Sequence, residues 1–313
     1  MSKSVNQRHI LVTGAHRSGS TFLGRMLSLP RHIGYINEPF NADQGIKGID
    51  TWFLYVREGL ESEAAGRALI QSILNGRASY KRLPLWNDLR PIQILAKLLV
   101  KSKINLWYRT AQLNPFVTRY LVKDPVACMA SEYMHRACDM DVVVLLRHPA
   151  AFAGSIKRLN WRYNFNEFYK QKELMRDHLD EVLAGVDPFD RPIIEEAAWL
   201  WKCIYHVLFR YLERNPNMIA VRHEDLSLEP GQEFMRLYGQ LQIDYTPAIQ
   251  ETISAYTGAA NPVDPTNNEI HVLKRDSKGN IKRWKNVLTE EEIAVIKRIT
   301  GDLASRYYTE EDW

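Results

Sequence analysis

Residues 14–21 have the types and the spacing of a loop that holds phosphate. They read GAHRSGST and stand between an apolar run at residues 9–13 and a stretch with helical periodicity. Gly14 and Gly19 allow a tight turn whose backbone approaches a ligand closely, and a helix that begins at the loop supplies N–H donors and the positive end of its dipole. The pattern predicts a phosphate-binding loop between a strand and a helix.

This loop lacks one residue that nucleoside triphosphatases need. Ser20 stands where those enzymes carry the lysine that reaches the β and γ phosphates, and Arg17 places a cation on the other side of Gly19. We therefore expect an anionic group at the loop, held by Arg17, Ser18, Gly19, Ser20 and Thr21. The alternative is a turn rich in glycine and serine that binds nothing.

A second set of residues suits the same anionic ligand. Residues 142–149 read VVVLLRHP, so Arg147 follows an apolar run and Ser155 lies about two turns into the helix that Pro149 can begin. An arginine and a hydroxyl that converge make an anion clamp. Arg147 also stands where a triphosphatase would end its strand in the aspartate that holds Mg²⁺, which favours a nucleotide site without a metal. For Arg147 alone, the alternative is a surface ion pair.

Together these two motifs resemble the sulfotransferase superfamily, whose members join a loop for a 5′-phosphosulfate to a later element of the form R-D-P-x-x-x-x-x-S for a 3′-phosphate. The spacing from Arg147 to Ser155 matches that element, with His148 in place of the usual aspartate, and we expect the histidine to hydrogen-bond in its stead. The stretch RSGSTFLG, with Glu38 and Pro39 shortly after it, is most similar to the carbohydrate sulfotransferases and their bacterial relatives.

The resemblance implies a reaction and a donor. It implies transfer of a sulfuryl group from 3′-phosphoadenosine 5′-phosphosulfate (PAPS), released as the bisphosphate PAP, to a hydroxyl or amine, by in-line displacement and without a metal. The loop residues would hold the phosphosulfate, while Arg147 and Ser155 would hold the 3′-phosphate. In the family a basic loop near the C-terminus also covers the nucleotide, which makes Arg275, Lys278 and Gly279 candidates; a solvated basic run is the alternative.

Sulfuryl transfer also needs a base for the acceptor's proton and a cation at the leaving oxygen. Arg17 is our choice for the cation. By analogy with carbohydrate sulfotransferases, Glu38 is the first choice of base, and Asp124, beside Lys123 at another predicted strand end, is the second. Glu38 has the alternative of capping a turn or pairing with a neighbouring cation.

Short apolar runs alternate with stretches of helical periodicity along the chain. The runs lie at residues 9–13, 33–36, 120–122, 142–146 and 218–221. The alternation predicts an α/β fold of the phosphate-loop type, with a mostly parallel sheet of about five strands flanked by helices and ligands at the carboxyl ends of the strands. We expect one domain over residues 1–313, with helical insertions at about residues 42–119 and 160–191 that form an acceptor-binding cap.

The acceptor is not specified by the sequence. The aromatic run at residues 161–169 suits stacking on a sugar or lining an apolar tunnel, but packing of a helix face explains it as well. A carbohydrate or another small molecule therefore stays open as acceptor. Two other functions also stay open: a phosphotransferase that uses ATP with Mg²⁺, and a nucleotide-binding protein without catalytic activity.

Composition argues against several other classes of protein. Lys and Arg exceed Asp and Glu by 41 to 37, an excess that suits an anionic ligand but is too small to indicate nucleic acid. The three cysteines have no CxxC spacing, so neither a disulfide framework nor a zinc site is expected. No segment offers the run of about eighteen apolar residues that a membrane span needs. We therefore expect a soluble protein in the cytoplasm, of undetermined oligomeric state.

Overall fold

The five apolar runs form five strands of one sheet. The computed structural model describes residues 8–81, 103–258 and 281–313. The strands are β1 (Ile10–Gly14), β2 (Ile33–Asn37), β3 (Arg119–Lys123), β4 (Asp141–Leu146) and β5 (Ile219–Arg222). Each lies within two residues of its predicted position, because a continuous apolar run can be buried on both faces of a parallel sheet. The predicted α/β fold class is confirmed.

The sheet order positions the candidate carboxylates. The order is β2-β3-β1-β4-β5, so β2 is an edge strand. β3 pairs in parallel with both β1 and β2, and its register aligns Lys123 with Asn37. Glu38 and Asp124 each come one residue later, so both begin loops at the carboxyl ends of neighbouring strands.

The chain divides into two compact units. Unit 1 comprises Met1–Thr13 and Leu23–Val143, and unit 2 comprises Gly14–Phe22 and Val144–Trp313. The phosphate loop and Arg147 thus belong to unit 2, whereas Glu38 belongs to unit 1. The expectation of a single domain over residues 1–313 stays a prediction.

In unit 1, helices and a short 3₁₀ segment accompany the strands. They are the C-terminal part of α1 (Ser20–Leu27), α2 (Glu63–Leu74), α4 (Lys103–Leu113), a 3₁₀ helix (Pro125–Ala130) and α5 (Ser131–Arg136). α4 packs against β2. The helix α2 turns Gly66, Ile70 and Ile73 inward, at the i, i+4, i+7 spacing of one helix face.

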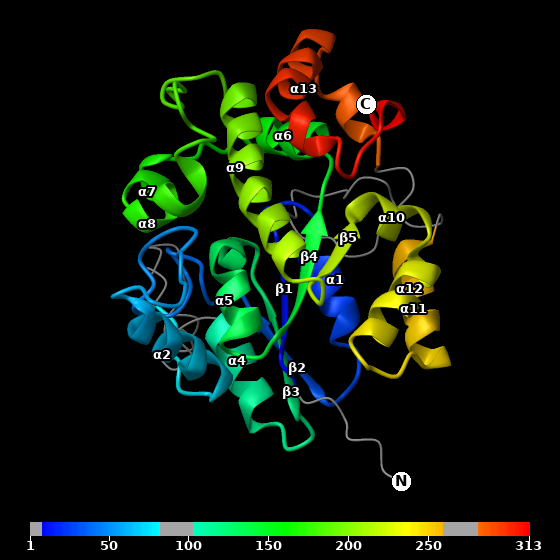
Figure 1. The fold of residues 1–313 in the computed structure, drawn as a ribbon. Helices are drawn as coiled ribbons and strands as arrows, with labels where there is room; N and C mark the ends of the chain where they lie inside the picture. The colour runs from blue at the N-terminus through cyan, green and yellow to red at the C-terminus, as the bar shows by residue number, and fades with distance from the viewer. Residues whose placement is uncertain (1–7, 82–102, 259–280) are drawn as a thin grey trace, which may run out of the picture. The chain divides into compact units, whose positions relative to one another are not determined.

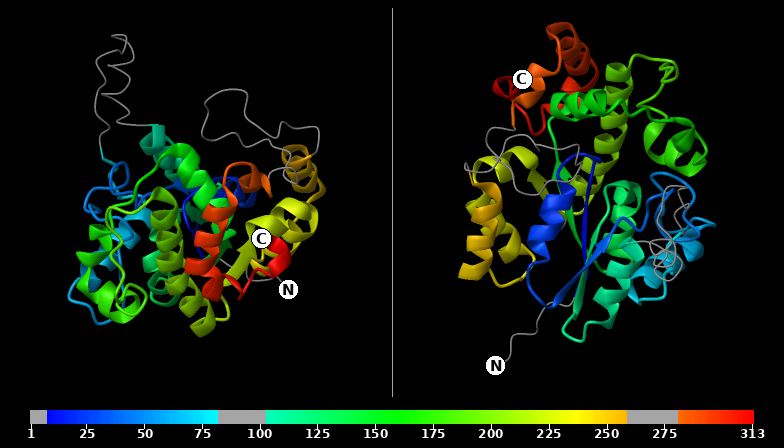
Figure 2. Two further views of the ribbon diagram at one scale, coloured as in Figure 1. Left: turned by 90° about the horizontal axis from the view of Figure 1, so that it is seen from above. Right: turned by 180° about the vertical axis from the view of Figure 1, so that it is seen from behind.

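Unit 2 is built on three helices that pack against one another: α6 (Pro149–Leu159), the long α9 (Ile193–Arg214) and α13 (Glu290–Ala304) (Figure 1). Three further helices follow β5 and pack in series, namely α10 (His223–Leu228), α11 (Pro230–Gln240) and α12 (Pro247–Thr257) (Figure 2). Thr289 and Glu292 form a capping box at the start of α13. Short 3₁₀ helices cover Arg283–Asn286 and Glu310–Asp312.

The two insertions differ in how helical they are. The described part of residues 42–119 contains the helices α2 and α4, and the pattern predicted an insertion of helical character. Residues 160–191 are less helical than expected: they contain only α7 (Asn166–Tyr169), α8 (Lys172–Leu174) and a π-helical turn (Met175–Leu179), and irregular chain follows to Pro192. Their role as an acceptor cap stays a prediction. In the described ranges, no helix combines the length and the apolar character needed to cross a bilayer.

Candidate active site

The loop between β1 and α1 has the backbone that its glycines predicted. Gly14 has φ +143°, and a Cβ there would lie 2.3 Å from the carbonyl oxygen of Leu145. Gly19 has φ +93°, and a Cβ there would lie 2.9 Å from the His223 ring. Arg17 also has a positive φ, 66°, which costs a non-glycine residue about 1–2 kcal/mol. Such costs persist where the surrounding structure fixes the chain, as at ligand sites.

The arginine at the end of β4 meets this loop. Arg147 donates a hydrogen bond from its guanidinium to the carbonyl oxygen of Arg17, and Arg17 Nε donates to Ser155 Oγ at 3.3 Å. Burial lowers the pKa of Arg147, although the nearby carboxylate of Glu224 opposes that shift. Arg147 Nε is buried and has no hydrogen-bond partner among the described residues. The loop and the clamp predicted from the sequence are therefore one cluster of donors.

A tyrosine that belongs to no sequence motif supports the loop. The hydroxyl of Tyr205, in the middle of α9, donates to the carbonyl oxygen of Leu145 at 3.0 Å and accepts from the N–H of Ala15 at 3.4 Å. It also lies 3.2 Å from the hydroxyl of Ser18. Trp201, one turn earlier, donates from its indole N–H to the carbonyl oxygen of Arg147 at 2.9 Å. Both residues lie among the buried positions of α9, so no local signal distinguishes them from ordinary core residues.

His148 takes the structural place expected of the usual aspartate. It is the N-cap of α6, and its Nδ1 accepts a hydrogen bond from the N–H of Ala150 at 3.3 Å. Burial lowers the pKa of His148 to about 3, so the ring is neutral at pH 7 and Nδ1 can accept. The ring stacks on Trp284 with a centroid distance of 5.3 Å and an interplanar angle of 11°. An imidazole can thus cap the helix without bringing a negative charge beside Arg147.

Glu224 ties three segments of unit 2 together. Its carboxylate accepts from the N–H of His148 at 3.0 Å and from the hydroxyl of Tyr308 at 3.1 Å. The side chain is buried, and burial raises its pKa, while hydrogen bonding to His148 and the charge of Arg147 act in the opposite direction. Glu224 is therefore a positioning residue for the start of α6.

The aromatic run at residues 161–169 divides in two. Tyr163, Phe165 and Phe168 pack on one another with centroid distances of 5.1–6.0 Å, as core rings do. Trp161 is 42% exposed and lies over the guanidinium of Arg17 at 5.6 Å. Core packing thus accounts for three of these rings, and Trp161 remains beside the loop.

In unit 1, the candidate base is paired with a lysine. Glu38 Oε1 and Lys123 Nζ form an ion pair, and the N–H of Glu38 donates to the carbonyl oxygen of Lys123 at 2.8 Å. The Lys123 side chain is 2% exposed, whereas that of Glu38 is 27% exposed. The pairing that was an alternative role for Glu38 is therefore present, yet the carboxylate keeps access to solvent. Glu38 also has a positive φ, 45°.

Asp124, the second candidate base, is used by the backbone. Its carboxylate accepts from the N–H of Phe40 at 2.6 Å and from that of Val126 at 3.0 Å, and the side chain has no exposed surface. Burial and the nearby charge of Glu38 raise the pKa of Asp124 to about 7, although the hydrogen bonds from the backbone and the charge of Lys123 act in the opposite direction. Each carboxylate oxygen of Asp124 thus accepts a backbone hydrogen bond, which fixes the loops after β2 and β3.

The predicted site residues thus form two groups. Unit 2 brings together Arg17, Ser18, Arg147 and Ser155, with Gly19, Ser20 and Thr21 in the same loop and the first turn of α1. Unit 1 brings together Glu38, Lys123 and Asp124. Arg275, Lys278 and Gly279 lie outside the described residues and stay predictions.

Comparison with known proteins identifies one family. The sequence model of the family described as "Sulfotransferase family" matches residues 9–247. No curated protein sequence matches the chain. Among solved structures, the chain is similar to the sulfotransferase domain from the curacin biosynthetic pathway, with 15% identity, a TM-score of 0.49 and coverage of 95% of this chain and 97% of that one.

Two further solved structures are similar over most of this chain. Sulfotransferase STF9 from Mycobacterium avium is 15% identical, with a TM-score of 0.47 and coverage of 97% of this chain and 77% of that one. Mouse sulfotransferase SULT7A1, complexed with PAP, is 10% identical, with a TM-score of 0.43 and coverage of 98% and 87%.

Proposed function

Because the chain belongs to the sulfotransferase family, as its match over residues 9–247 establishes, we propose that it transfers a sulfuryl group from PAPS to a hydroxyl or amine of a small-molecule or carbohydrate acceptor. The proposal goes beyond the family in four respects, which are the donor, the class of acceptor, the roles of individual residues and the independence from metal.

The observation that carries the proposal is the unsatisfied donor at Arg147. Among the described residues, the buried Nε–H of Arg147 has no acceptor, which is costly because folding removed this donor from water without replacing its hydrogen bond. An anionic oxygen that accepts from Arg147 Nε would remove that cost. Ser155 and Arg17, which are hydrogen-bonded to each other beside it, add a hydroxyl and a second guanidinium. This donor set fits a phosphate group.

The donor would be held at two points of unit 2. Arg17, Ser18 and the first turn of α1 would bind the 5′-phosphosulfate, where the N-terminus of α1 favours negative charge. Arg147 and Ser155 would bind the 3′-phosphate. When bound, PAPS supplies the activated sulfuryl group. The guanidinium of Arg17 would stabilise the negative charge that develops on the leaving oxygen, so a metal would not be needed for that role.

The acceptor's proton would go to Glu38. Glu38 is the better candidate because part of its carboxylate is exposed, whereas both oxygens of Asp124 accept backbone hydrogen bonds in the interior. Lys123 would orient the carboxylate of Glu38 through their ion pair. Asp124 would then be a positioning residue for the loops that carry Glu38 and Lys123.

A transfer assay tests the proposed function. The protein is incubated with PAPS labelled in the sulfuryl group, a panel of sugars, phenols and amines, and EDTA. We expect labelled product from at least one acceptor, with release of PAP. Failure to turn over PAPS, together with Mg²⁺-dependent turnover of ATP, would support a phosphotransferase instead. Tight binding of PAP without turnover of any acceptor would support a binding protein.

A further inference from the structure

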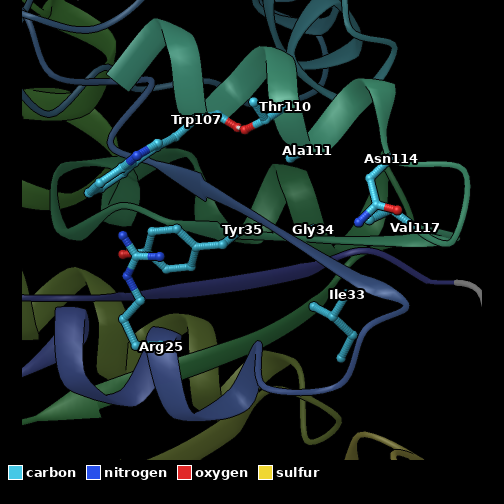
Figure 3. A pocket seen from close by; sticks show the side chains of 9 residues that line it. All are labelled: Arg25, Ile33, Gly34, Tyr35, Trp107, Thr110, Ala111, Asn114 and Val117. Atoms are coloured by element: carbon cyan, nitrogen blue, oxygen red, sulfur yellow. Dashed lines mark hydrogen bonds between the residues drawn. The ribbon is translucent and has the colours of Figure 1, made fainter. Parts of the chain in front are cut away.

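A surface pocket in unit 1 has the composition of a separate ligand site. It has a volume of about 320 Å³ and lies along the edge strand β2 (Figure 3). Its lining comes from α1, β2, α4 and the segment after α4: Arg25, Ile33, Gly34, Tyr35, Trp107, Thr110, Ala111, Asn114 and Val117. None of the residues assigned above to the donor or to the proton transfer lines it.

A cation lies at one end of this pocket. Arg25 is the one charged residue of the lining, and its guanidinium lies over the ring of Tyr35 at 4.0 Å and over that of Trp107 at 4.7 Å. In the described part of the chain, no carboxylate forms an ion pair with Arg25. Stacking uses the face of a guanidinium and leaves its N–H edge for an anion, commonly as a bidentate pair with a carboxylate or a sulfate.

The rest of the pocket suits a ring. Trp107 is 47% exposed, so part of its indole surface is available to a ligand. Ile33, Ala111 and Val117 add apolar surface, and Figure 3 shows Asn114 at the end opposite Arg25. Asn114 Oδ1 accepts from the N–H of Phe116 at 3.1 Å, which leaves the amide nitrogen as a donor.

We propose that this pocket binds a ring-bearing organic anion, with its carboxylate or sulfate on Arg25 and its ring against Trp107. The volume is at the lower end of the range for ligand pockets and suits one ring with its substituents. Both an aromatic acid and an acidic sugar have this chemistry. The proposal is independent of sulfuryl transfer, since it requires neither PAPS nor turnover.

Calorimetric titration of the full chain, without PAPS, tests the proposal. The probes are benzoate, phenyl sulfate and glucuronate, with benzamide and methyl glucoside as neutral counterparts. We expect at least one anion to bind with a dissociation constant in the millimolar range or below, more weakly at high salt, and at least tenfold more tightly than its neutral counterpart. Comparing the dissociation constants of benzoate and phenyl sulfate with that of glucuronate shows whether the pocket prefers an aromatic ring or a sugar.

Variants assign the binding to this pocket. Arg25→Gln should weaken binding of the anion about tenfold or more, Arg25→Lys should weaken it less, and Trp107→Ala should weaken it through loss of ring contact. Arg109→Gln, which removes an exposed cation from the same helix as Trp107, is the matched control and should change nothing. The proposal is overturned if no anion binds at 10 mM, if neutral probes bind equally well, or if Arg25→Gln and Arg109→Gln behave alike.

Discussion

The proposed binding of a 3′-phosphorylated nucleotide depends most on Arg147. Its buried Nε has no hydrogen-bond partner in the part of the chain that the structure describes, and Arg17 hydrogen-bonds to both Arg147 and Ser155. Arg147→Ala should therefore weaken binding of PAP about 10- to 100-fold, since a hydrogen bond to a charged group is lost. Adenosine 5′-phosphosulfate lacks the 3′-phosphate, so the substitution should weaken its binding far less.

Equilibrium titration with both ligands checks this prediction. Arg298→Ala removes an exposed cation from α13, in the same unit, and serves as the control, with little effect expected on either ligand. If Arg147→Ala lowers the affinity for both ligands by the same factor, Arg147 does not bind the 3′-phosphate.

Glu38 and Asp124 provide a paired test of the base. Glu38→Gln keeps the size of the side chain but cannot take a proton, so kcat should fall about 10²- to 10⁴-fold with nearly unchanged affinity for PAP. Asp124→Asn should mainly reduce stability, because an amide cannot accept from both Phe40 and Val126. Steady-state kinetics and PAP titration of both variants distinguish these roles. Near-normal kcat in Glu38→Gln, with an inactive Asp124→Asn that still binds PAP, would reverse the assignment.

At the scale of elements, α9 supports the phosphate loop through one hydroxyl. Tyr205→Phe keeps the ring in the core but removes the contacts to Ala15, Ser18 and Leu145. We expect a loss of stability of about 1–3 kcal/mol and a loss of PAP affinity of about tenfold. Urea unfolding and PAP titration measure the two effects. Tyr307→Phe is the control; if it matches Tyr205→Phe, the hydroxyl of Tyr205 has no special role.

The start of α6 should respond to acid because its cap is a buried histidine. The pKa of His148 is about 3 in the folded protein and near 6.5 in the unfolded chain, so the unfolded chain binds more protons between these values. Stability from His148 is therefore complete above about pH 6.5 and is lost as the pH falls. His148→Asn keeps an acceptor at the cap but does not titrate.

Urea unfolding at pH 7.5 and pH 5 measures this contribution. Between pH 7.5 and pH 5, the free energy of unfolding should fall by about 2 kcal/mol more in the wild type than in His148→Asn. This is the amount expected because pH 5 lies about 1.5 pH units below the pKa of the unfolded histidine. A loss of the same size in both proteins would mean that His148 does not remain neutral in the fold.

For the whole molecule, local patterns in the sequence predicted the strands and the family. Apolar runs located all five strands. Spacing along the chain also predicted the phosphate loop at residues 14–21 and the anion clamp of Arg147 and Ser155; both of these residues hydrogen-bond to Arg17 of the loop, and their roles stay predictions. The family match confirms the sulfotransferase family and the enzyme class that these motifs suggested.

Other features depend on contacts between distant segments, which no local pattern encodes. Tyr205 reaches the loop across 187 positions of sequence, and the Arg25 pocket needs α4 to pack on β2. The periodicity of residues 160–191 predicted more helix than forms, because aromatic residues that pack as a cluster need not lie on one helix face.

The central claim is that unit 2 binds a 3′,5′-bisphosphorylated nucleotide and not a triphosphate with its metal. Thermal unfolding with PAP plus EDTA, compared with ATP plus Mg²⁺, tests it most directly. PAP at a hundred times its Kd should add about 2.7 kcal/mol of stability and raise Tm by several degrees, whereas ATP with Mg²⁺ should leave Tm almost unchanged. A rise in Tm with ATP and Mg²⁺, and none with PAP, would contradict the account.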